Sequence, residues 1–158
     1  MTLEQAQLIV KKYVDGWNNS NGYIPLWVHL VKPGAPVNIP GVTFGMTRDP
    51  EKIAGMHYRV NAQLIVIREG MVPESILTTF FHEYGHAKYE SGRSAVDIID
   101  SEVAAIRSSL ELCVVEGLEE LAYREAKAVK AMAVDEPYRS AVERLKDDAL
   151  WRKYSRMD

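Results

Sequence analysis

A pair of histidines four residues apart has the residue type and spacing best suited to chemistry in this sequence. They belong to the stretch His82-Glu83-Tyr84-Gly85-His86, an HExxH motif. On an α-helix, positions four apart differ by only about 40° around the axis, so both imidazoles leave one face and can bind one metal ion. Glu83 lies about 100° from His82, where its carboxylate can reach a metal-bound water without ligating the metal. The motif therefore predicts metal ligands at His82 and His86 and a general base at Glu83.

A catalytic zinc normally has three protein ligands and leaves one position open for water, so this site needs a third ligand. The other histidines, His29 and His57, both precede the motif. This order excludes the metzincin pattern and argues against a SprT-like protease, because both place a histidine downstream. The candidates are therefore the downstream carboxylates, which are Glu90, Asp97, Asp100, Glu102, Glu111 and Glu116.

Glu102 fits the third position best. Glu90 lies one turn beyond the second histidine on the same helix and would have to bend back toward the metal. Glu102 lies near the start of the next predicted helix, where the small residues Ala104 and Ala105 allow two helices to approach closely. The helix dipole alone would explain a lone glutamate there, and Asp97 is the alternative if that helix starts later. The incomplete two-histidine site favours Glu102.

The first elements that must position these residues are a helix and a sheet. Residues 2–17 carry apolar side chains at helical spacing, and Thr2 with Gln5 resembles a capping box. Prolines and glycines then separate short runs of β-forming residues, which predict a small, mainly antiparallel sheet. These runs are residues 25–31, 41–45, 57–60 and 64–67, with a hairpin turn at Asn61-Ala62 joining the last two. Residues 64–67 form either a buried core strand or an edge strand that pairs with an extended substrate.

The rest of the chain predicts helices. Residues 73–90 form the helix that carries the motif, with Pro73 tolerated at its start. Two or three helices follow from about Val96, with interruptions at Gly117 and at residues 135–137. The predicted architecture is α+β: an N-terminal helix, the sheet, the motif helix packed on a further helix, and a C-terminal helical region. That last region either forms a homo-oligomer interface or covers the core.

The composition limits the classes of protein. The chain has 158 residues, 26% of them charged and 47% hydrophobic, which predicts one domain over residues 1–158. A net charge of −3 argues against binding to nucleic acid or to an anionic membrane. No membrane-spanning stretch or signal peptide is apparent, and the single cysteine, Cys113, cannot form an intramolecular disulfide and is expected to be buried. A cytoplasmic protein is expected.

The sequence resembles the ImmA/IrrE-type metallopeptidases, which are small gluzincin-like proteins. The matching segments are residues 80–86, which include the motif, and residues 102–110, and the resemblance covers about residues 55–112. In that family the motif is commonly HELGH, and the glutamate of a following helix ligates zinc. The resemblance implies a zincin-like fold, with His82, His86 and Glu102 as the zinc ligands and Glu83 as the base.

These observations predict a zinc-dependent metallopeptidase that holds one Zn²⁺ per chain and hydrolyses peptide bonds of a specific protein substrate. One alternative is a non-enzymatic, metal-containing protein-interaction module of the kind that mobile elements encode. Another is a hydrolase of non-peptide amides or esters. Glu83 favours an enzyme, because a structural zinc needs no general base and normally has four protein ligands. His57, Tyr58 and Tyr89 are candidates for stabilising the oxyanion by residue type only.

Overall fold

The computed structural model describes residues 1–20, 25–31, 55–59 and 63–156. Its contacts divide the chain into two compact units, Met1–Phe80 and Phe81–Asp158. The described residues contain six helices and three strands, which confirms the α+β composition. None of the described helices is long and apolar enough to cross a membrane. The single zincin-like domain over residues 1–158 stays a prediction.

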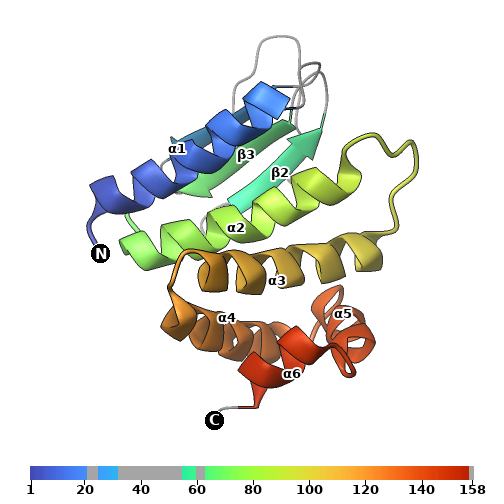
Figure 1. Cartoon of the computed structure of the whole chain (residues 1–158). Coiled ribbons are helices and arrows are strands. Elements are labelled where there is room, and N and C mark those ends of the chain that lie inside the picture. Colours follow the sequence, from blue (N-terminus) through green and yellow to red (C-terminus); the bar gives the residue numbers. More distant parts are fainter. Residues whose placement is uncertain (21–24, 32–54, 60–62, 157–158) are drawn as a thin grey trace. The chain divides into compact units, whose positions relative to one another are not determined.

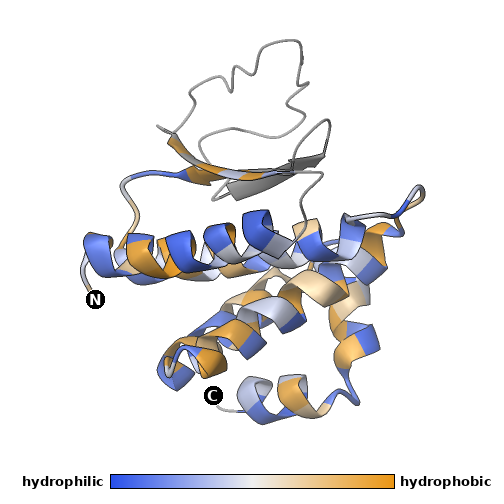
Figure 2. Cartoon of the chain, turned by 45° about the horizontal axis from the view of Figure 1, so that its top comes forward, coloured by the Kyte–Doolittle hydropathy of each residue, from blue (hydrophilic) through white to orange (hydrophobic). Residues whose placement is uncertain are grey.

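The first unit begins with helix α1, Leu3–Ser20. The predicted capping box is confirmed: the Thr2 amide donates to Gln5 Oε1 at 2.8 Å, and the Gln5 amide donates to Thr2 Oγ1 at 3.1 Å. These bonds satisfy amide groups that would otherwise lack partners at the helix start. Figure 2 shows hydrophilic and hydrophobic residues interspersed along α1, the helix that follows the N-terminus. Ala6 and Trp17 are its buried residues.

The sheet of the first unit has strands β1 (Leu26–Val31), β2 (Gly55–Arg59) and β3 (Gln63–Arg68). Their order is β1-β3-β2, with β1 parallel to β3 and β2 antiparallel to β3. The expectation of a mainly antiparallel sheet is therefore wrong, because one of its two pairings is parallel. Enough chain separates β1 from β3 to supply the long connection that parallel pairing needs.

The β2–β3 pairing is the one that the hairpin prediction described. The predicted turn at Asn61-Ala62 and the predicted run at residues 41–45 lie outside the described residues. β3 is the central strand, and its residues Ile65, Val66 and Ile67 are buried. The hypothesis that this strand lies at an edge and pairs with a substrate is wrong, because both of its sides are already paired within the sheet.

The motif helix, α2, has the predicted bounds, Pro73–Glu90, and passes the boundary between the two units after Phe80. In the second unit, α3 packs against α4, α5 and α6 (Figure 1). The predicted interruption at Gly117 is confirmed: its φ of 73° allows the turn that ends α3, and the Leu118 amide donates to the Cys113 carbonyl at 2.8 Å. The bounds of these helices are Ile98–Val115 for α3, Glu119–Met132 for α4, Tyr138–Leu145 for α5 and Ala149–Ser155 for α6.

The core of the second unit contains the apolar side of α3, with Ile106, Leu110 and Cys113 fully buried. Burial and, to a lesser extent, the charge of Glu125 raise the pKa of the Cys113 thiol to about 12. A thiol with that pKa does not ionise near neutral pH and is a poor nucleophile. The prediction of a buried cysteine is confirmed.

Candidate metal centre

Helix α2 places both motif histidines on one face. His82 and His86 are one turn apart, and their ring centroids are separated by 5.0 Å. His82 is only 8% exposed. Phe81 and Ala87, which are neighbours of the two histidines in sequence, are fully buried, so this part of α2 does not lie free at the surface.

Helix α3 brings Glu102 to the same place. Its Oε1 lies 2.8 Å from Nε2 of His82, and its Oε2 lies 3.2 Å from Nε2 of His86. One ligand atom from each of these residues lies within 4.8 Å of the other two. The structure therefore brings together the three predicted ligands and places them where one metal ion could contact them all.

One oxygen of this carboxylate has unsatisfied bonding capacity. Glu102 is 6% exposed, and its Oε1 accepts no hydrogen bond of acceptable geometry from the described residues. The nearby Nε2 of His82 is close in distance but does not meet the directional requirement of a hydrogen bond. A buried, unsatisfied carboxylate oxygen is costly. Coordination of a metal ion would satisfy it together with the lone pairs of the two imidazoles.

The charges in the site are strongly coupled. Burial disfavours the protonated form of His82, but contact with Glu102 and the charges of Glu83 and Glu125 outweigh this and raise its pKa to about 9. Burial also disfavours ionised Glu102, but its contacts with His82 and His86 hold its pKa well below the usual value. Each residue therefore favours the charged form of the other: a proton on His82 and an ionised carboxylate on Glu102. A metal ion that binds here must displace that proton.

The close approach of α2 and α3 depends on Gly85. A Cβ at this position would lie 2.6 Å from Ser108 Cβ and 2.7 Å from Ala105 Cα. Ala105 is fully buried, and Ala104 contributes a carbonyl oxygen 3.0 Å from the same point. Ser108 Oγ also donates to the Phe81 carbonyl at 2.9 Å. The predicted close contact through small residues is confirmed, and it sets the distance between Glu102 and the histidines.

Gly85→Ala should therefore lower the free energy of unfolding by about 1–3 kcal/mol, because its methyl group would collide with α3 backbone. Gly16→Ala in α1 is the matched control, since nothing lies within 4 Å of its Cβ position. That substitution should raise stability by about 0.5–1 kcal/mol through helix propensity alone. Urea unfolding of both variants would measure the difference. Equal stabilisation by the two substitutions would show that the helices are not in close contact at Gly85.

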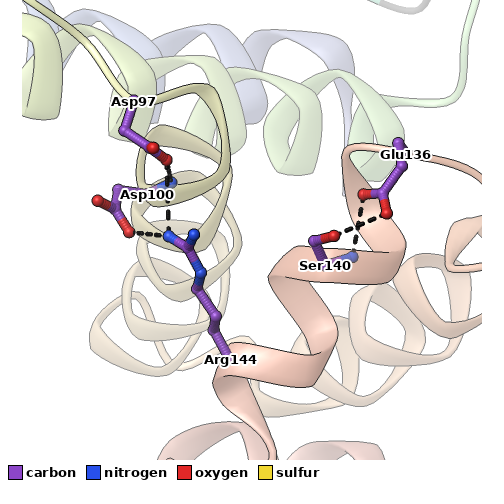
Figure 3. A network of polar contacts seen from close by, with 5 residues as sticks. All are labelled: Asp97, Asp100, Glu136, Ser140 and Arg144. Atoms are coloured by element: carbon purple, nitrogen blue, oxygen red, sulfur yellow. Dashed lines mark hydrogen bonds and ion pairs between the residues drawn. The ribbon is translucent and has the colours of Figure 1, made fainter.

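The alternative acidic ligands at the start of α3 have structural partners. Asp97 caps the helix, and its Oδ1 accepts a hydrogen bond from the Asp100 amide at 2.8 Å. Figure 3 shows that Arg144 of α5 pairs with both carboxylates, at 3.5 Å from Asp97 Oδ1 and in a shorter contact with Asp100. Neither residue belongs to the group of converging ligand atoms within the described chain. They hold the first turn of α3, which precedes Glu102.

Sequence reasoning missed three residues beside the histidines. The Tyr138 ring of α5 stacks on His82 with centroids 6.2 Å apart, and the carboxyl group of Glu125 on α4 acts on His82 through its charge. Burial raises the pKa of Glu125 against the opposing effects of His82 and a hydrogen bond with Ser109. Ser101 Oγ lies 2.7 Å from His86 Nδ1. Only Ser101 had a sequence signal, because it directly precedes the predicted ligand.

The residue that stabilises the oxyanion stays a prediction. Tyr89 lies on α2 with its ring 4.1 Å below the Arg93 guanidinium, and its carbonyl accepts a hydrogen bond from Arg93 Nε at 2.6 Å. His57 and Tyr58 lie on β2, but their side chains are outside the described part of the structure.

Comparison of the chain with protein-family models, with curated proteins and with solved structures gives no match.

Proposed function

We propose that this protein is a zinc-dependent metallopeptidase that acts on a specific protein substrate in the cytoplasm. Zinc is bound by His82, His86 and Glu102, and Glu83 is the general base. The fold around the site is zincin-like, and the chain is a small member of the ImmA/IrrE-type peptidases that its motif resembles.

The observation that carries this proposal is the buried Glu102 carboxylate, which faces two imidazoles and whose Oε1 has no hydrogen-bond partner among the described residues. Two imidazoles and one carboxylate are typical ligands of a catalytic zinc, whereas Ca²⁺ and Mg²⁺ prefer oxygen ligands throughout. The donor atoms present therefore fit zinc. Three protein ligands also leave a position open, which favours catalysis over a structural role.

Glu83 is suited to moving a proton. It lies on α2 directly after the ligand His82, is only partly buried, and lies outside the group of converging ligand atoms among the described residues. Zinc, when bound, supplies Lewis-acid chemistry: it acidifies water and polarises a carbonyl group. The Glu83 carboxylate accepts the proton of the attacking water and then donates it to the leaving amine, so the base is regenerated after each cycle.

The Tyr138 ring stacks on His82, and Ser101 and Glu102 of α3 are buried, so the ligands have little room to move. A site whose ligands are held in place before the metal binds loses less conformational entropy on binding. The same arrangement would serve a non-enzymatic module, so hydrolysis has to be measured together with metal content.

Protein purified without added metal should contain about one zinc ion per chain. Removal of zinc by a chelator should abolish cleavage of the substrate, and stoichiometric zinc should restore it. Elemental analysis gives the metal content, and comparison of cell proteomes with and without the active protein identifies the substrate. Absence of any transition metal, with no uptake in a zinc titration, would contradict the proposal. Bound zinc without any hydrolysis would indicate the interaction module instead.

A further inference from the structure

The two ring nitrogens of His86 have different neighbours. Its Nε2 lies 3.2 Å from Oε2 of Glu102, on the side of the converging ligand atoms. Its Nδ1 lies 2.7 Å from Oγ of Ser101, which is within hydrogen-bond distance. Ser101 is only 3% exposed, so water has little access to compete for this contact. The contact is therefore a constraint on His86 rather than a transient surface interaction.

A neutral imidazole carries one proton, and only the nitrogen without it can bind a metal. A serine hydroxyl can accept a hydrogen bond from Nδ1–H and still use its own proton elsewhere, for example toward a carbonyl of its own helix. When a metal ion occupies Nε2, the proton of the neutral ring must lie on Nδ1, and Ser101 Oγ is placed to accept it at 2.7 Å.

We infer that Ser101 is a positioning residue that selects the metal-binding tautomer of His86 and orients its ring. This inference rests on the proposed function, because a tautomer matters only if His86 binds a metal. A ligating histidine commonly donates its second ring proton to an oxygen acceptor, which fixes the ring and strengthens the ligand. Ser101 directly precedes Glu102 on α3. One turn of this helix therefore supplies both the third ligand and the hydrogen-bond partner of His86.

Residues that do not belong to the metal site hold Ser101 in position. Its amide donates to the Asp97 carbonyl at 3.0 Å, and Asp97 is the N-cap residue of the helix. Arg144 pairs with Asp97 and with Asp100, the residue before Ser101 (Figure 3). These ion pairs attach the first turn of α3 to α5. They therefore limit the movement of the Ser101 hydroxyl.

Ser101→Ala should lower the zinc affinity about 10–100-fold, measured by competition with a chromophoric chelator. Ser108→Ala is the matched control, because Ser108 also lies on α3 and donates to α2, at the Phe81 carbonyl, but does not touch a ligand. Its zinc affinity should equal that of the wild type. Unchanged affinity in Ser101→Ala, or an equal loss in both variants, would overturn the inference, since an equal loss indicates general packing of α3 on α2.

Nitrogen chemical shifts of His86 in the zinc-loaded protein give a second readout that needs no activity. In the wild type, Nε2 should bind the metal and Nδ1 should carry the proton. In Ser101→Ala the Nδ1 proton should exchange with water faster, because its acceptor is gone, while Ser108→Ala should keep the wild-type pattern. Zinc bound through Nδ1, or equal proton exchange in the wild type and Ser101→Ala, would overturn the role of Ser101. A wild type that takes up no zinc would instead refute the proposed function, and with it the inference that rests on it.

Discussion

Glu102→Ala should weaken zinc binding more than roughly a hundredfold. Zinc sites with four protein ligands bind with about 10–16 kcal/mol, so one ligand contributes about 3 kcal/mol, which corresponds to that factor. Glu102 Oε1 and Oε2 both face histidine nitrogens, at 2.8 and 3.2 Å, so no other carboxylate replaces it without movement of α3. A zinc titration of the purified variant measures the loss.

Three neighbouring carboxylates are internal controls for Glu102. Asp97→Ala, Asp100→Ala and Glu111→Ala should change zinc affinity far less than Glu102→Ala does. The first two residues pair with Arg144, and Glu111 is exposed and lies 3.4 Å from Arg107. Selective loss in Asp97→Ala would reject Glu102 as the third ligand but keep a metal site. Equal affinity in all four variants would leave the two histidines without a third protein ligand.

Glu83→Gln should keep zinc affinity close to that of the wild type and lower hydrolysis about 100- to 10,000-fold. The amide has nearly the same shape as the carboxylate but cannot take the proton from water. Glu83 is not among the converging ligand atoms in the described chain, so its loss should leave the metal in place. The rate of substrate cleavage by zinc-loaded protein measures the effect.

Glu111→Gln makes the same chemical change on an exposed part of α3 and should retain the wild-type rate. Full activity of Glu83→Gln would exclude Glu83 as the base. Loss of both zinc and activity in this variant would indicate that Glu83 contributes to metal binding, a role that the geometry does not assign to it.

The local elements and the motif could be predicted from the sequence alone. The capping box at Thr2, the bounds of α2 and the end of α3 at Gly117 all depend on residues within one or two turns of each other. Helix periodicity placed both histidines on one face, because residues four apart in sequence are separated by about one helical turn. Glu102 could be selected as well, because a short connection and small residues predicted that two consecutive helices would pack together.

The direction of strand pairing was decided only by the tertiary structure. β1 pairs parallel with β3, which makes β3 central and removes it as an edge for substrate pairing. The residues of a strand specify which of its faces is buried, but they do not specify its neighbour or the direction of that neighbour. That choice depends on how the whole connection between the strands is packed.

The surroundings of the metal ligands were likewise decided by packing between helices that are distant in sequence. Tyr138 stacks on His82 from α5, and Arg144 of the same helix holds the first turn of α3. Ser101 directly precedes Glu102 in the sequence, but only the packing of α3 on α2 places its Oγ 2.7 Å from His86 Nδ1. The types and spacing of the residues determined which groups can do chemistry. The packing of α2, α3 and α5 determined their orientation, because a hydrogen bond or a ring contact requires positions in space that no local pattern specifies.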